Sequence, residues 1–146
     1  MRLQTNRRQL GQTIVEFALL APLMFLFVYM IVDFGRAMTE RIMVEHAVRE
    51  GARYAAVHTS CDDIMTRTYS QAQKIIDKDT NVKVTYSNDP AEAGDTVTVS
   101  IVNFNYTPAI INSISKLTGG TAPSIPLTSS ASARLEMEVK PAGGCP

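Results

Sequence analysis

The stretch IVEFALLAPLMFLFVYMIV, residues 14–32, determines the architecture that we expect of this chain. Every residue in it is apolar except Glu16 and Pro22. As an α-helix rising 1.5 Å per residue, these residues span about 28 Å, close to the roughly 30 Å hydrocarbon thickness of a bilayer. The run is too long for the apolar part of a cleaved secretory signal and too continuous for most soluble core helices. It therefore predicts a membrane-spanning helix that the mature protein keeps.

The charges around the run indicate its orientation. Residues 1–15 contain three arginines and no acid, whereas the residues after the run are mixed in sign. By the positive-inside rule, residues 1–11 lie in the cytoplasm and the C-terminal bulk lies across the membrane. The 146 residues include 14 Lys+Arg and 14 Asp+Glu. This balance argues against a protein that binds nucleic acid through an overall positive charge.

Glu16 is the exception inside the apolar run. Ionisable side chains in such runs are costly to bury and usually have a partner and a function. Glu16 is also the third residue of the run, so its carboxylate is close enough to the end to reach the membrane interface instead. The position alone leaves both interpretations open.

The rest of the sequence predicts an α+β fold. Residues 33–57 continue the helix with an amphipathic pattern, and the rod is about 67 Å long if it spans residues 13–57. Ser60 resembles the N-cap of a second, shorter helix that ends near Lys78. Alternating apolar residues then predict strands over residues 82–86, 97–101 and 131–139, which form a small antiparallel sheet packed against the helices. Residues 107–128 are a long connection that can hold a short helix around residues 110–117.

Cys61 and Cys145 are the only cysteines in the sequence. In the oxidising compartment across the membrane they are permitted to form a disulfide. The bridge would close a loop of about 85 residues and stabilise the fold by about 4–5 kcal/mol in the loop-entropy model. Two free thiols are the alternative.

The sequence offers little of the chemistry that catalysis needs. His46 and His58 are twelve residues apart, which is not the i,i+4 spacing of a metal pair on a helix. Asp62 and Asp63 are better explained as acids in the first turn of a helix than as metal ligands. No phosphate-binding glycine loop, Cys-x-x-Cys pair or nucleophile elbow is present. We therefore expect no enzyme, no metal site and no cofactor.

The segment GQTIVEF, residues 11–17, resembles the cleavage region of a type IV prepilin, with a basic leader that ends in Gly11 and a glutamate as the fifth residue beyond it. More narrowly, GQTIVEFALLAPLMFLF, VDFGRAM and EHAVREGARYAA resemble the TadE-like family of the tight-adherence (Tad, Flp-type) pilus system. VTVSIVNFNYTP and PLTSSASARLEME are loosely similar to the C-terminal region of that family.

The resemblance implies a domain organisation and a processing step. A prepilin peptidase would cut between Gly11 and Gln12. Residues 1–11 would be the leader, residues 12–32 the transmembrane segment, and residues 33–146 a periplasmic or extracellular pilin-like domain. The protein would cross the inner membrane once, with its N-terminus cytoplasmic and its C-terminus periplasmic, and could enter the extracellular pilus.

The resemblance also implies a function. Such proteins are minor pilins or pseudopilins needed to assemble a pilus used in surface adherence and biofilm formation. The partners would be the prepilin peptidase, the other minor and major pilins and the inner-membrane assembly platform, with no nucleic acid. The alternative is a single-pass anchored binding domain that is exported and has no role in a fibre.

Glu16, Phe17 and Pro22 are the expected assembly residues. Cleavage would create an ammonium group at Gln12, and the Glu16 carboxylate would attract such a group on a neighbouring pilin strongly in low dielectric. Pro22 cannot donate to the Ala18 carbonyl and so permits a kink while the subunit leaves the bilayer. Further candidate contacts are Phe34, Met38 and the small residues Gly51, Ala52, Ala55 and Ala56; for those from Ala52 onward, packing against this chain's own sheet is the more ordinary explanation.

Overall fold

A computed structural model describes residues 7–58, 60–72, 75–88, 90–137 and 145, with side chains described from Gly11 onward. Residues 1–6 of the leader predicted over residues 1–11 therefore lie outside the described residues, and residues 7–11 belong to the first helix. The elements, in chain order, are α1 (Arg7–Ala55), α2 (Cys61–Ala72), α3 (Lys78–Asn81), β1 (Val82–Tyr86), β2 (Thr96–Ile101), β3 (Asn105–Tyr106), α4 (Ala109–Thr118), β4 (Ile125–Pro126) and β5 (Ser129–Arg134).

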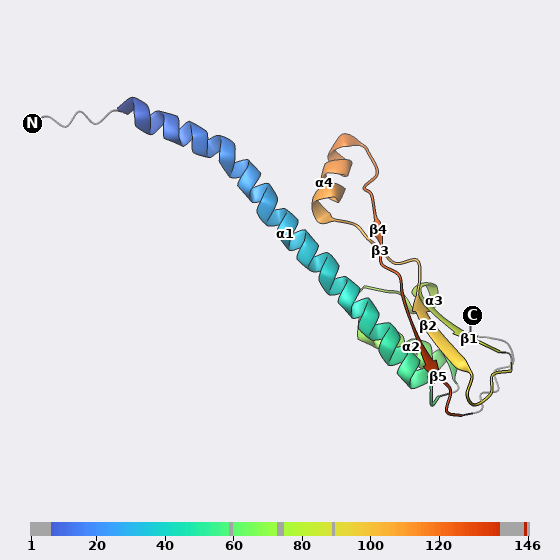
Figure 1. The fold of residues 1–146 in the computed structure, drawn as a ribbon. Coiled ribbons are helices and arrows are strands. Elements are labelled where there is room, and N and C mark those ends of the chain that lie inside the picture. The colour runs from blue at the N-terminus through green and yellow to red at the C-terminus, as the bar shows by residue number, and fades with distance from the viewer. Residues whose placement is uncertain (1–6, 59, 73–74, 89, 138–144, 146) are drawn as a thin grey trace, which may run out of the picture.

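The long helix α1 organises the molecule. It is one continuous helix of 49 residues, and Pro22 lies inside it. Its C-terminal end carries α2 and the main sheet, while its N-terminal half extends away from them (Figure 1). The expected rod is confirmed, although it begins at Arg7 rather than at Thr13 and ends at Ala55 rather than at Val57.

The main sheet is antiparallel with the strand order β1-β2-β5. Val82 lies opposite Ile101, and Val99 lies opposite Ala131. Since side chains alternate between the two faces of a strand, the valines of β1 and β2 share one face. This face packs against α1 and α2, and the α+β prediction is confirmed. The core contains Val44, Ala47, Val48, Ala52, Ala55, Ile64, Met65, Ala72, Val82, Val84, Val97, Val99, Ile101 and Leu135.

The helices α1 and α2 approach each other most closely at Gly51. A Cβ atom built on Gly51 would overlap the Thr68 side chain of α2 and would lie 3.1 Å from Cγ1 of Val99 in the sheet. The Thr68 hydroxyl is itself buried and donates to the Ile64 carbonyl oxygen, 2.9 Å away. A side chain at position 51 would therefore push α1 away from both of its neighbours.

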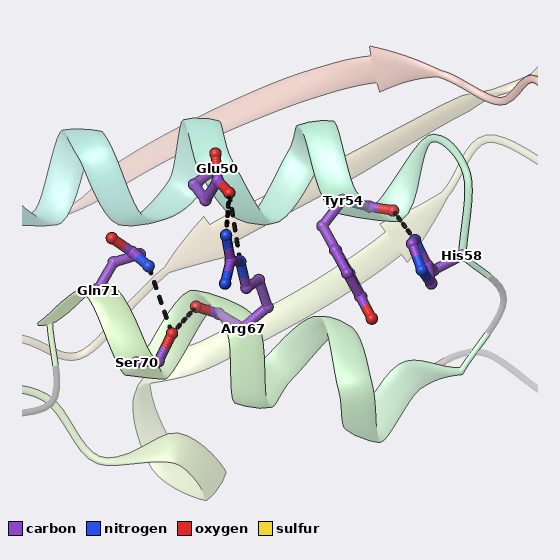
Figure 2. A network of polar contacts seen from close by, with 6 residues as sticks. All are labelled: Glu50, Tyr54, His58, Arg67, Ser70 and Gln71. Atoms are coloured by element: carbon purple, nitrogen blue, oxygen red, sulfur yellow. Dashed lines mark hydrogen bonds and ion pairs between the residues drawn. The ribbon is translucent and has the colours of Figure 1, made fainter.

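Polar contacts line the outer edge of the α1–α2 pair (Figure 2). Arg67 of α2 donates to Oε1 of Glu50 on α1 from Nη2 at 2.7 Å and from Nε at 3.2 Å. The His58 ring stacks on Tyr54, with ring centroids 3.7 Å apart. The Arg67 and Glu50 side chains are both partly exposed. We therefore expect this ion pair to contribute about 0.2–1 kcal/mol to the free energy of unfolding, less than the core beneath it.

A disulfide joins Cys61, the first residue of α2, to Cys145 near the C-terminus. The two Cα atoms are 5.6 Å apart, and the two cysteines are separated by 84 positions. Cys145 belongs to the hydrophobic core, so the bridge attaches the end of the chain to the domain.

Three details differ from the sequence-based expectations. The second helix ends at Ala72, and a separate one-turn helix, α3, follows because Asp77 caps it by accepting from the Asp79 N–H at 3.0 Å. The last strand runs from Ser129 to Arg134 and not over residues 131–139, and residues 138 and 139 of the predicted strand lie outside the described residues. The connection over residues 107–128 contains the expected helix as α4 and also β4, which pairs with β3.

Candidate functional site

The apolar run lies on the surface of the molecule. The helix that contains it is long and apolar enough to cross a membrane, and none of its most apolar stretch is buried inside the protein. Phe17 is 68% exposed, and Phe25 is 66% exposed. Such a large apolar surface needs an apolar environment. The N-terminal part of α1 is therefore not the core helix of a soluble domain, and it fits a single-pass membrane anchor.

Glu16 has a partner on its own helix. The side-chain amide of Gln12 donates to Oε1 of Glu16 over 3.0 Å, across one helical turn. The structure therefore brings together the residue after the expected cleavage point and the acid of the apolar run. A hydrogen bond to the carboxylate lowers the cost of holding it in an apolar environment.

Gly11 is inside α1, one turn after the helix begins. A Cβ atom built on it would meet no described atom within 4 Å. Glycine at this position is therefore not required by packing within the described part of the chain. Any need for it must come from flexibility of the backbone or from a partner that contacts it.

Phe17 and Pro22 are exposed on the same helix as Glu16. The helix continues through Pro22 and curves in its blue N-terminal part (Figure 1). Proline removes one backbone hydrogen bond from a helix, so this part of α1 bends more easily than the rest.

The further contact candidates divide into two groups. Phe34 is 65% exposed and Met38 is 38% exposed, so both are available to a partner. Gly51, Ala52 and Ala55 are buried between α1, α2 and the sheet, and Ala56 is half-buried. The small residues therefore serve this chain's own packing.

A junction that the sequence did not reveal lies directly after the apolar run. The Tyr106 hydroxyl donates to the backbone oxygen of Asp33 at 3.0 Å and to Oδ1 of its carboxylate at 3.3 Å. Oδ2 of the same carboxylate accepts from the Ile110 N–H at 3.3 Å, at the first turn of α4. Pro108, the residue before α4, makes no side-chain cap bond in the described structure. Asp33 therefore supplies from α1 the acceptor that an N-cap side chain would normally supply.

A missing local cap was the one sequence signal for this junction. A helix that begins after Pro108 has no Ser, Thr, Asp or Asn at the usual capping position, which leaves its first N–H groups to water or to an acceptor from elsewhere in the fold. Which acid supplies it depends on how the chain returns to α1.

The junction perturbs the titration of its residues. Burial and the neighbouring Asp33 carboxylate raise the pKa of the Tyr106 phenol. Burial raises the pKa of Glu40, and the Arg36 guanidinium partly opposes this effect. Arg36, Glu40 and Tyr106 line an open hollow beside α1. Among the residues that the structure describes, no cluster of three or more His, Cys, Asp or Glu could hold a metal ion.

The comparison with protein families bears on this N-terminal part of the chain. A family model described as TadE-like protein matches residues 11–53. Residues 11–53 are TadE-like. The resemblance inferred from the sequence motifs is thereby confirmed over the membrane-spanning run and most of the remainder of α1.

The TadE-like match bears on the general function. The TadE-like family is associated with the Tad pilus, so the match to residues 11–53 suggests a protein associated with that pilus system. The matched residues include Gln12, Glu16 and Asp33, but they end before α2, the sheet and the residues that Asp33 contacts in the arm. No curated protein and no solved structure matches the chain.

Proposed function

We propose that this chain is a membrane-anchored minor pilin or pseudopilin that a Tad, Flp-type, pilus needs for its assembly. The observation that carries the proposal is the TadE-like match to an exposed apolar helix in which Gln12 and Glu16 are in contact. The prepilin peptidase, the other pilins and the inner-membrane assembly platform are the proposed partners. The proposed location is the inner membrane, with the N-terminus cytoplasmic, the C-terminus periplasmic, and the pilus as the final destination.

The first proposed step is cleavage between Gly11 and Gln12. In the structure this peptide bond lies within α1, which begins at Arg7. A peptidase would have to unwind this turn to reach the bond, and glycine is the residue that weakens a helix interior most after proline. Cutting here removes the arginines and leaves the whole apolar run, and therefore the anchor, in the mature chain.

The second proposed step is pairing of Glu16 with a newly formed amine. After cleavage α1 would begin at Gln12, so Glu16 would lie near the positive end of the helix dipole, which favours a carboxylate. An unpaired carboxylate costs about 2.5–3.5 kcal/mol at the bilayer centre and less near its edge. The Gln12 amide, 3.0 Å from Glu16, would offset part of this cost until the amine of a neighbouring pilin replaces it. The exchange would set the axial register between two subunits.

The decisive experiment compares processing and piliation in cells that express the full chain. For the natural sequence we expect a membrane-bound product whose N-terminus is Gln12. Gly11→Leu should leave a precursor that still carries residues 1–11, since Gly11 contacts nothing that would affect folding among the described residues. Glu16→Ala should be cleaved and inserted normally but should abolish pili.

Two further variants separate charge from other effects. Glu16→Gln keeps a hydrogen-bonding side chain next to Gln12 but removes the charge, so it should also abolish pili. Glu92→Ala, which removes an exposed acid from the loop before β2, should leave pili unchanged. Normal piliation with Glu16→Ala would refute the pairing. Normal piliation without the chain would indicate an anchored binding domain with no fibre role.

A further inference from the structure

The helix α4 lies beside the end of the apolar run. The β3–β4 ribbon and α4 form an arm that extends from the main sheet toward the N-terminal half of α1 (Figure 1). The junction at Asp33 holds the start of α4, and Ser113, one turn further, lies with Tyr29 and Val32 around a common hollow. The chain direction of α4 thus leads from Asp33 back along the membrane-spanning helix.

The arm exposes an apolar face beside the end of the apolar run. Ile114 is 54% exposed, Leu117 is 88% exposed, and Ile125 of β4 is 50% exposed. Between the arm and α1 is a groove of about 340 Å³, lined almost wholly by apolar side chains. The residues that line it from α1 include Leu26, Met30 and Phe34, and those from the arm include Pro108, Ile111 and Ile125.

The length of the apolar run determines where this face lies. Residues 14–32 span about 28 Å as a helix, which is no more than the bilayer core requires, so the turns at Leu26 and Met30 have to be inside the membrane. Residues of α4 line the same hollows as these turns, which puts the start of α4 at the level of the membrane surface if the apolar run spans the bilayer. We propose that α4 is an interfacial helix, whose apolar face enters the periplasmic leaflet of the bilayer and sets the depth of the domain. This inference rests on the proposed membrane anchor.

The polar groups of α4 suit an interfacial position. Three of its hydroxyl side chains, those of Ser113, Ser115 and Thr118, donate to carbonyl oxygens of their own helix at 2.8–3.0 Å. Their donors therefore do not have to be satisfied by water, which is scarce at the acyl boundary.

The charge of the arm also suits a lipid surface. Residues 96–135 contain no Asp or Glu, and Lys116 is exposed in the last turn of α4. A lysine there can extend its ammonium group to lipid phosphates while its stem remains among the acyl chains. An acid-free arm avoids repulsion by anionic headgroups.

The test uses the absence of tryptophan from the natural sequence, because any introduced tryptophan is then the sole reporter. Leu117→Trp places it on the apolar face of α4, at a side chain that is 88% exposed and therefore not needed for packing. Phe25→Trp places it in the membrane-spanning run, and Ser132→Trp on the open face of β5. Each full-length variant is reconstituted in vesicles of phosphatidylethanolamine and phosphatidylglycerol, with and without brominated acyl chains.

We expect brominated lipid to quench the emission of the Leu117→Trp and Phe25→Trp variants and to leave the Ser132→Trp variant unchanged. Quenching of the Phe25→Trp variant without quenching of the Leu117→Trp variant would overturn the interfacial helix and leave the anchor intact. A blue shift of the Leu117→Trp variant that grows with protein concentration, without quenching, would mean that another subunit covers this face. Absence of quenching in the Phe25→Trp variant would overturn the membrane anchor itself and, with it, this inference.

Discussion

The Tyr106 hydroxyl donates a hydrogen bond to the backbone oxygen of Asp33, 3.0 Å away, although the two residues are 73 positions apart. The same aspartate accepts from the Ile110 N–H with its carboxylate. One residue at the end of the apolar run therefore holds both the β3–β4 ribbon and the start of α4. The position of the arm relative to α1 depends on this contact.

Asp33→Ala is predicted to release the arm. The substitution leaves the Ile110 N–H without its acceptor and removes one of the two oxygens that Tyr106 contacts. Loss of a capping side chain costs about 0.5–2 kcal/mol. We expect faster amide hydrogen exchange at Ile110 and in the first turn of α4, with the core strands β1 and β2 unchanged, measured on the full chain in detergent micelles.

Tyr106→Phe is the matched control for that prediction. It removes the two bonds of the hydroxyl but leaves the contact between Asp33 and the Ile110 N–H. Exchange at Ile110 should therefore increase less than with Asp33→Ala. Equal exchange in the two variants would show that the Asp33 carboxylate is not the cap of α4.

Alkaline pH is predicted to weaken the same junction. Burial and the Asp33 carboxylate raise the pKa of Tyr106 above its usual value near 10. The unfolded chain therefore loses this proton at a lower pH than the folded chain, so stability is retained below about pH 10 and falls as the pH rises further. In unfolding experiments between about pH 8 and pH 11, Tyr106→Phe should reduce the alkaline loss of stability.

Some loss of stability at alkaline pH should remain in the Tyr106→Phe variant. Burial also raises the pKa of Tyr86, whose hydroxyl is buried without a partner among the described residues. Tyr86→Phe should remove this second contribution to the loss of stability at alkaline pH. If neither variant changed the pH dependence of unfolding, the two phenols would not be responsible for it.

Gly51→Ala is predicted to destabilise the domain. Its new methyl group would overlap the Thr68 side chain and crowd Val99. Overpacking of this kind costs about 1–3 kcal/mol, which exceeds the gain of up to about 1 kcal/mol from replacing glycine in a helix. Denaturant unfolding of the full chain in micelles measures the difference.

Gly35→Ala is the control on the same helix. A Cβ atom at this position meets no described atom within 4 Å, so only the helix-propensity gain of about 0.5–1 kcal/mol should be seen. Adding Thr68→Ala to Gly51→Ala should recover part of the lost stability, because the Thr68 hydroxyl is the nearest obstacle. A Gly51→Ala protein as stable as Gly35→Ala would contradict the close approach of α1 and α2.

Reduction of the disulfide is predicted to lower the free energy of unfolding. Cys61 and Cys145 close a loop with a separation of 84 positions, for which the loop-entropy model gives about 4–5 kcal/mol. The midpoint of guanidinium unfolding should fall when reductant is added. The double variant Cys61→Ser/Cys145→Ser should unfold at a low midpoint with or without reductant, and an unchanged midpoint in the reduced natural chain would contradict the prediction.

Much of this protein could be read from local patterns. The apolar run and the pattern after it predicted α1, because a helix of nineteen residues that are almost all apolar has few stable surroundings other than a bilayer. Alternation over residues 82–86 and 97–101 predicted β1 and most of β2, since a strand buries every second side chain. The motif around Gly11 and Glu16 indicated the family that the match to residues 11–53 confirms.

The tertiary structure alone decided the rest. Whether Gly51 served a partner or this chain's own core depended on Thr68 of α2 lying against it, and whether α4 was merely part of a loop depended on Asp33 capping it from α1. Sequence periodicity reports which side of an element is apolar, because that property repeats locally along the chain. The periodicity does not indicate which residue, distant in the sequence, will lie in contact with a given side chain, because that depends on how the elements pack in space.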